Sequence, residues 1–157
     1  MSVAEAIVTS SSVADAVATR RSIRAFSPRP VPFETIRRIL DQARWAPSGC
    51  NFQPWEATVL TGAPLKALQD RLLASAPDNP QEYDFSAPGQ VEKYQARLRA
   101  VGAAMYEAQG IQRQDAAARA KFASDNCTSF GAPVLLLCHF PKLMKEAQWS
   151  DMGMWLQ

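Results

Sequence analysis

Residues 46–55 read Ala46-Pro47-Ser48-Gly49-Cys50-Asn51-Phe52-Gln53-Pro54-Trp55, and this stretch says most about the fold of the chain. It joins a predicted amphipathic helix to a predicted strand. The two prolines restrict the backbone, Gly49 permits an unusual turn, and three polar side chains offer hydrogen bonds beside an aromatic residue. This composition suits a rigid loop that holds a flat polar molecule. A loop that merely stops a helix also needs Pro and Gly, so that alternative stays open.

A cluster of cations, Arg20-Arg21-Ser22-Ile23-Arg24, lies just upstream of this loop. It falls where a predicted helix gives way to an extended segment. Guanidinium groups bind phosphate through two hydrogen bonds at once and a serine hydroxyl adds another, so the cluster could hold a phosphate monoester. The alternative is a solvated basic helix end that satisfies the last carbonyls of the helix. Taken alone, the segment favours that alternative.

Hydrophobic periodicity predicts a chain of helices with two strands. Helices are predicted at residues 12–20, 33–45, from 62–64 onward, 91–110, 115–123 and 149–157, and strands at residues 55–61 and 133–140. The second strand is a continuous apolar run, which predicts burial on both faces. Residues 76–89 hold three prolines among polar residues and predict a long loop. Because nothing closes the last helix, we expect a C-terminal truncation.

Composition limits the classes of function. The 157 residues, 47% hydrophobic and 20% charged, suit a single globular domain. A net charge of +2 with scattered arginines argues against nucleic acid as a partner, and no apolar run approaches the roughly 20 residues of a membrane span. Three widely spaced cysteines with one histidine argue against a metal site and fit a cytoplasmic location.

The residues that could serve as nucleophiles or bases give weak signals. Cys50 has no predicted cation or helix N-terminus to activate it, so a bystander thiol is expected. His139 ends an apolar strand and is expected to be structural. The chain has neither a Gly-x-Gly-x-x-Gly motif nor a Walker motif, which argues against the common nucleotide-binding loops. We therefore expect no protein residue to act as a catalytic nucleophile.

Three motifs follow one another in a definite order: Arg20-Arg21-Ser22-Ile23-Arg24-x-Phe26, Ile36-x-x-Ile39-Leu40-x-x-Ala43 and the loop Ala46 to Trp55. Phe130-Gly131-Ala132-Pro133 and Trp149-x-Asp151-x-Gly153-x-x-Leu156-Gln157 follow later. In this order they resemble the FMN-dependent nitroreductase family over roughly residues 16–157. The arginine-rich helix around Leu98-Arg99-Ala100-Val101-Gly102 is similar to that of the nitrobenzoate-reductase-like branch.

The resemblance implies an α+β fold: a three-layer sandwich with a central, mainly antiparallel sheet flanked by helices. Residues 1–157 would form a single nitroreductase domain that covers the N-terminal two-thirds or so of the family's length. Family members work as intertwined homodimers with two FMN sites at the interface. The resemblance also implies FMN as cofactor, NAD(P)H as electron donor and a small-molecule electron acceptor as partner.

The resemblance further assigns roles to residues of the two segments. Arg20, Arg21 and Ser22 would contact the FMN phosphate and ribityl chain. Arg24 would lie near the pyrimidine edge of the isoalloxazine, where a fixed positive charge favours the reduced flavin. The residues that would reach the flavin of the partner subunit are Pro47, Ser48, Gly49 and Asn51, with Gln53 assisting. Gly153 would let the facing helix approach the ring.

The reaction implied is a ping-pong hydride transfer. NAD(P)H would reduce the flavin at N5 and leave, and a nitroaromatic, quinone or similar acceptor would then take its place. Relatives with this fold also perform reductive dehalogenation or flavin destruction, which gives a second interpretation. A third is a truncated, non-catalytic fragment that does not retain flavin, since family members continue well past residue 157.

Overall fold

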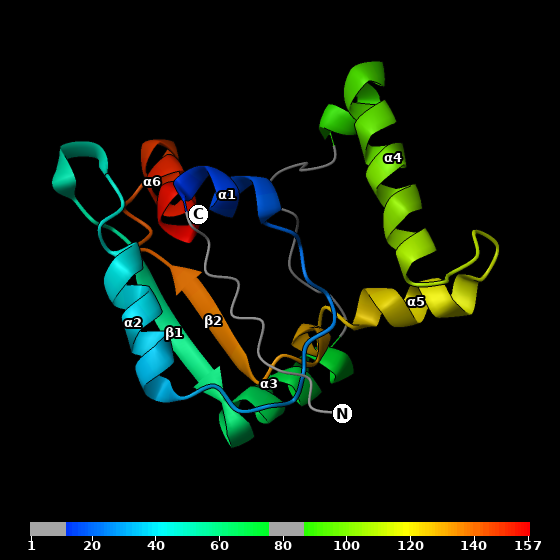
Figure 1. Ribbon diagram of the computed structural model, residues 1–157, viewed down its shortest axis with the longest axis horizontal. Coiled ribbons are helices and arrows are strands. Elements are labelled where there is room, and N and C mark those ends of the chain that lie inside the picture. Colours follow the sequence, from blue (N-terminus) through cyan, green and yellow to red (C-terminus); the bar gives the residue numbers. More distant parts are fainter. Residues whose placement is uncertain (1–11, 76–86) are drawn as a thin grey trace.

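The computed structural model describes residues 12–75 and 87–157 (Figure 1). Within these ranges, strands β1 (Glu56–Thr61) and β2 (Val134–His139) form an antiparallel two-stranded sheet, in which Glu56 pairs with His139. The helices are α1 (Val13–Thr19), α2 (Phe33–Ala43), α3 (Gly62–Ala74), α4 (Glu92–Ala108), α5 (Ala116–Ser124) and α6 (Glu146–Leu156), with short 3₁₀ turns η1 (Gly49–Asn51), η2 (Ala87–Gln90) and η3 (Ser129–Gly131). The α+β class predicted from the sequence is confirmed.

Each predicted helix and strand is present, with small shifts at the ends. Helix α2 ends at Ala43, two residues before the prediction, because the next turn tightens: the N–H of Ala46 donates to the carbonyl of Ala43 at 3.0 Å. Helix α6 begins three residues early, since the Gln148 side chain accepts from the N–H of Lys145 at 3.1 Å and caps the helix. Residues 76–86 of the predicted loop lie outside the described residues.

The predicted burial of both faces of β2 is wrong for the described residues. Leu137 is 42% exposed and His139 is exposed, whereas Leu136 and Cys138 on the opposite face line a hollow with α2 and α6. The rule behind the prediction applies to strands covered on both sides by helices. Here β2 pairs only with β1 among the described residues, so its side chains alternate between covered and open faces.

The buried core of the described chain is small. It consists of Ile36, Leu65, Phe122, Met152 and Trp155. Many large apolar side chains remain open to solvent, among them Val13 at 82%, Phe33 at 71% and Leu98 at 62%. A large apolar surface is therefore available for contacts with another chain.

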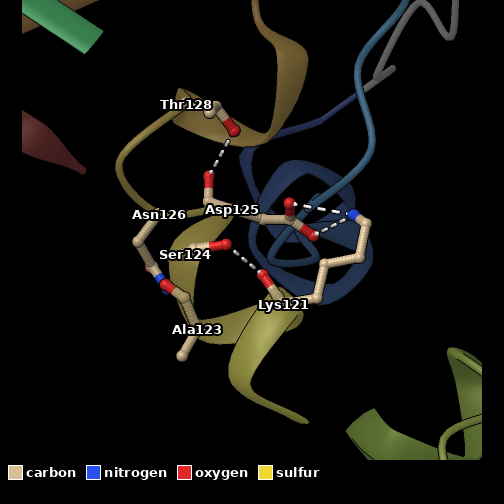
Figure 2. A network of polar contacts seen from close by, with 6 residues as sticks. All are labelled: Lys121, Ala123, Ser124, Asp125, Asn126 and Thr128. Carbon is tan, nitrogen blue, oxygen red and sulfur yellow. Dashed lines mark hydrogen bonds and ion pairs between the residues drawn. The ribbon is translucent and has the colours of Figure 1, made fainter. Parts of the chain in front are cut away.

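Helices α4 and α5 form an arm that extends from the sheet (Figure 1). An edge-to-face contact between Tyr106 and Phe122, with centroids 6.0 Å apart, joins the end of α4 to α5. Figure 2 shows how α5 ends: Lys121 pairs with Asp125 at 3.2 Å, while Ser124, Asn126 and Thr128 donate to carbonyls of the same turn. These bonds fix the direction in which the chain leaves α5. Among the described residues, no helix combines the length and apolarity needed to cross a membrane.

Candidate functional site

The loop between α2 and β1 carries unusual backbone geometry. Cys50, Asn51 and Gln53 have φ angles of 52°, 56° and 47°, all in the left-handed region. The expectation that Gly49 supplies the unusual turn is wrong, because these three side-chain-bearing residues supply it instead. Such residues cost about 1 to 3 kcal/mol each and persist only where their surroundings fix them. The loop therefore stores strain that something must hold.

Hydrogen bonds inside the loop provide part of that support. The Ser48 hydroxyl accepts from the N–H of Gln53 at 3.0 Å, which closes the turn around the left-handed residues. The N–H of Asn51 donates to the Ser48 carbonyl at 3.1 Å, and the N–H of Phe52 donates to the Gly49 carbonyl at 3.1 Å. Ser48 thus fixes the loop through both its side chain and its carbonyl.

A carboxylate on α6 anchors the loop through a hydrogen bond. Asp151 Oδ1 accepts from the N–H of Gly49 at 3.2 Å, and the Asp151 side chain is only 3% exposed. Its second oxygen, Oδ2, is buried without a hydrogen-bond partner among the described residues. A buried carboxylate is costly unless it is well hydrogen-bonded, so its place under the loop indicates a specific role. Asp151 was not predicted as a site residue, although the motif Trp149-x-Asp151-x-Gly153 contains it.

An aromatic pair joins the far end of the same loop to α6. The rings of Trp55 and Trp155 stack with centroids 6.4 Å apart and planes 14° from parallel. Trp155 is 8% exposed, and Pro54 beside Trp55 is buried as well. Asp151 and Trp155 lie one helical turn apart, so one face of α6 holds both ends of the loop.

Two amide side chains meet on the exposed side of the loop. Gln53 Nε2 donates to Asn51 Oδ1 at 2.9 Å. This bond leaves Asn51 Nδ2 as a donor and Gln53 Oε1 as an acceptor with no further partner in the described part of the chain. A neighbouring donor and acceptor of this kind suit the edge of a flat heterocycle.

The predicted phosphate cluster is exposed throughout and extended in conformation. Arg21 Nη1 donates to the carbonyls of Ala18 at 2.9 Å and Arg20 at 2.8 Å, so this guanidinium group closes the end of α1. This contact is the one expected of a basic helix end that satisfies the last carbonyls of its helix, which is the alternative to a phosphate site. In the described residues, no carboxylate pairs with Arg20 or Arg24, and their guanidinium groups remain available to an anion.

The segment after this cluster is fixed to the loop before β2. The N–H of Phe26 donates to the Phe130 carbonyl at 3.2 Å. Gly131, with φ at 77°, lies so close that an added Cβ would stand 3.7 Å from the Phe26 carbonyl oxygen. Phe26 and the Phe130-Gly131 motif are therefore in contact, with the segment of Phe26 against the turn η3.

The structure does not bring the two halves of the predicted site together within one chain. The extended segment after α1 and the loop after α2 lie well apart in Figure 1. Gly153 lies on α6 near Asp151 and is exposed. Apart from its chain neighbours and the backbone of its own helix, no described atom lies within 4 Å of where a Cβ would stand. The chain thus presents two separate half-sites. One is the cationic segment Arg20–Arg24, and the other is the loop of residues 46–55 held by Asp151 and Trp155, which we call the clamped loop.

A third polar group occupies the sheet. Thr58 Oγ1 lies 3.3 Å from His139 Nε2, and His139 Nδ1 lies 3.5 Å from Glu56 Oε2. The order hydroxyl, imidazole, carboxylate resembles a nucleophile triad, but the three residues are exposed. They do not line the hollow between α4 and α5, the one beside α2 and α6, or the one at the start of α3. We interpret them as cross-strand pairs, in keeping with a structural His139.

The thiols give no sign of catalysis. Cys50, Cys127 and Cys138 are free, and burial raises the pKa of the Cys138 thiol. A raised pKa lowers the thiolate fraction near neutral pH, which makes Cys138 a weaker nucleophile. No group of three His, Cys, Asp or Glu side chains placed to hold a metal ion occurs among residues 12–75 and 87–157.

Comparison with known proteins identifies the class. The Nitroreductase family matches residues 17–155, and the chain belongs to this family and has its fold. It is similar to the 4-nitrobenzoate reductase of Pseudomonas putida, with 39% identity over 143 residues that cover 90% of this chain and 63% of that protein.

Solved structures are similar as well. The FMN and NADPH-dependent nitroreductase NfnB from sphigopyxis sp. strain HMH shares 43% identity at a TM-score of 0.86, over 93% of this chain and 67% of that one. The FMN-dependent nitroreductase NfnB from Mycobacterium smegmatis in complex with NADPH shares 28% identity at a TM-score of 0.76, over 90% and 64%. The chain thus spans about two thirds of the length of these relatives.

Proposed function

We propose that the chain acts in an FMN-dependent oxidoreductase that transfers hydride from NAD(P)H to nitroaromatic, quinone or similar acceptors. The observation that carries the proposal is the strained loop clamped on a buried carboxylate in a member of the Nitroreductase family. Strain of this kind is retained where a site needs a fixed geometry. The FMN and NADPH named for the similar structures provide the cofactor and the donor.

The cationic half-site would hold the phosphate end of FMN. Arg20 and Arg24 offer guanidinium groups that pair with no carboxylate of residues 12–75 and 87–157, and Ser22 offers an exposed hydroxyl in the same segment. Arg21 keeps further N–H groups beyond the nitrogen bound to the helix end, so it could serve the phosphate and α1 together. Arg24 would place its charge near the pyrimidine edge, where negative charge accumulates on reduction.

The clamped loop would hold the ring. The free donor of Asn51 and the free acceptor of Gln53 match the alternating donors and acceptors of a pyrimidine edge. Pro47, Ser48 and Gly49 would fix the backbone of the loop and thereby the position of the Asn51 and Gln53 side chains relative to the ring. The open space beside Gly153 leaves room for a flat ring near α6.

The separation of the half-sites leads us to propose a homodimer. One chain would contribute the arginines and its partner the loop, so each flavin would lie between two subunits. The apolar side chains around the arginines support this proposal, because Val13 is 82%, Val17 61% and Ile23 58% exposed. Apolar residues exposed to this extent on one segment are typical of a surface that another chain covers.

When bound, FMN would supply the exchange of hydride between donor and acceptor, which we propose to occur in two half-reactions. The residues of the chain would bind and orient: the arginines fix the phosphate, and the loop fixes the ring and limits access of water. No nucleophile of the chain takes part in this scheme, in keeping with the exposed Cys50 and the structural His139.

The proposal is tested by reconstitution and assay. Purified protein is mixed with FMN, its visible absorbance is recorded after gel filtration, and oxidation of NADPH and NADH is followed with 4-nitrobenzoate and with a quinone. We expect retained flavin and acceptor-dependent oxidation, both reduced in a variant that combines Arg20→Gln and Arg24→Gln. Arg29→Gln, a nearby exposed arginine outside the cluster, is the matched control and should behave as wild type.

The alternatives give different results in the same assay. A protein that retains no flavin supports a non-catalytic fragment and overturns the enzyme proposal. Retained flavin with release of halide from a halogenated phenol, but no nitro reduction, supports a reductive dehalogenase. Loss of flavin absorbance during aerobic turnover indicates a flavin-modifying enzyme.

A further inference from the structure

A hollow of about 680 Å³ lies between the second half of α4, the turn that follows it and α5. None of the residues that line it belongs to the clamped loop or to the Arg20–Arg24 cluster. Its volume falls within the range of about 300 to 1,000 Å³ typical of small-molecule sites. The hollow is therefore a separate candidate site, located on the arm of Figure 1.

The charges around the hollow are unbalanced. Arg99, Arg113 and Arg119 line it, and Glu107 is the one acid among the lining residues. The charge of Arg99 is matched outside the hollow, because its Nη2 lies 2.6 Å from Glu92 Oε1. In the described chain, neither Arg113 nor Arg119 has a carboxylate within ion-pair distance. Two guanidinium charges thus line the hollow without an ion-pair partner in the described chain, beside one carboxylate, that of Glu107, which pairs with neither.

One of these charges is held in position before any ligand arrives. The Arg119 guanidinium lies over the Tyr106 ring at 5.2 Å from its centroid, and its Nη1 donates to the Arg113 carbonyl at 3.4 Å. Tyr106 is itself fixed by the edge contact with Phe122. A preorganised guanidinium group loses less entropy when it binds an anion than a free one does.

Apart from Gln112, the residues that complete the lining are mainly apolar. Ile111, Ala103 and the ring of Tyr106 border the space near the two cations. A small anion alone would leave this part of the hollow unfilled, whereas a ring that carries an anionic group would fill both parts. The chemistry therefore selects ligands with a planar apolar body and one charged end.

We propose that this hollow binds an anionic group carried on a flat ring, either an aromatic carboxylate or the phosphate monoester of a nucleotide. Arg113 and Arg119 receive the anion through charge-assisted hydrogen bonds, and Ile111 with Tyr106 contacts the ring. The two ligand sources share this chemistry. The site needs no flavin, so it can be tested even where the proposed function fails.

The test measures binding of two probes, benzoate and adenosine 2′-monophosphate, to flavin-free protein by calorimetry at low salt. We expect at least one probe to bind and its uncharged counterpart, benzamide or adenosine, to bind at least about tenfold more weakly. Arg113→Gln and Arg119→Gln should each weaken the probe about tenfold. Arg37→Gln is the matched control, because Arg37 pairs with Glu34 on α2 away from the hollow.

The outcomes distinguish the two classes of ligand from each other and from a failure of the proposal. Preference for benzoate assigns the site to a carboxylated ring, and preference for the nucleotide assigns it to a phosphorylated one. The Arg113 side chain is exposed and takes part in no ion pair within the described residues, so the fold of Arg113→Gln, checked by circular dichroism, should be unchanged. The proposal is overturned if neither probe binds, if the uncharged counterparts bind equally well, or if the folded Arg113→Gln variant binds as wild type does.

Discussion

The amide N–H of Gly49 donates to Oδ1 of Asp151 at 3.2 Å, across 102 positions of sequence. This bond joins a strained loop to the buried face of α6. The loop holds three left-handed side-chain-bearing residues, and a loop of this kind relaxes unless it is anchored. The pair therefore explains how an exposed loop keeps a geometry that its own residues do not favour.

Removal of the Asp151 carboxylate should affect flavin binding more than folding. Asp151→Ala removes the anchor of the loop, but it also removes a buried charge whose Oδ2 has no partner in the described chain, and these two effects on stability oppose each other. We expect a change of at most about 2 kcal/mol in the free energy of unfolding and at least about tenfold weaker FMN binding. Urea unfolding and fluorescence titration with FMN measure the two quantities.

Asp151→Asn separates the hydrogen bond from the charge. The amide oxygen can still accept from Gly49, so we expect FMN affinity between those of wild type and Asp151→Ala. Asp70→Asn, an exposed carboxylate on α3, is the control and should leave affinity unchanged. Wild-type FMN affinity in Asp151→Ala would show that the loop does not need this anchor.

Substitution of Gly49 by alanine tests whether a ligand approaches its backbone. An added Cβ would stand 3.9 Å from Asp151 Oδ2, an ordinary contact distance, and Gly49 has no left-handed φ that requires glycine. Gly49→Ala should therefore fold with a melting temperature close to that of wild type. We expect weaker FMN binding nonetheless, since the added methyl group would occupy space that the flavin needs. Unchanged flavin affinity would exclude a close approach at this position.

The stacked tryptophans should dominate the stability of this region. Trp155 is 8% exposed and stacks on Trp55, so Trp155→Ala should cost about 3 to 5 kcal/mol. That loss is large against a typical total of about 5 to 15 kcal/mol. The matched control is Trp45→Ala: Trp45 is 80% exposed and contacts Arg44, which predicts a loss of about 1 kcal/mol or less. Equal losses in thermal or urea unfolding would contradict this account of the core.

The thiol of Cys138 should respond to pH in a way that reports its burial. Burial raises its pKa, so alkylation by iodoacetamide should require a higher pH in folded protein than in urea. The sign for stability follows: above the ordinary thiol pKa the unfolded chain loses its proton first, so the contribution of the neutral thiol to stability falls as pH rises. Mass spectrometry of the labelled peptide gives both pH profiles, and coincident profiles would contradict the shift.

Local pattern was sufficient to predict the elements of this fold. Apolar spacing located the helices, and β1 alternates between half-buried Ala57 and exposed Glu56 and Thr58. The error in β2 has a physical cause: a run of apolar residues shows that a strand prefers burial, but not how many neighbours cover it. Coverage depends on contacts between distant segments, which periodicity does not encode.

In the candidate site, too, local features could be predicted from the sequence, whereas contacts between distant segments could not. The polar side chains of the loop were visible in the sequence, and their mutual bonds follow from short separations such as Asn51 to Gln53. Asp151 could not be assigned from spacing, because its role depends on how α6 packs under a loop about one hundred residues away. The left-handed angle at Cys50 was missed because cysteine does not signal it as glycine would. The angle at Asn51 was missed although asparagine adopts this region more readily than most residues that carry a side chain.

The central claim is that each flavin site takes its arginines from one chain and its loop from another. Complementation tests it most directly: a variant with Arg20→Gln and Arg24→Gln is mixed under exchange conditions with a variant that carries Asn51→Ala and Gln53→Ala, and bound FMN is measured. Because a mixed dimer would contain one intact site, the account predicts that about a quarter of all sites regain flavin, although neither variant binds it alone. A mixture that binds no more flavin than the separate variants would contradict the shared site.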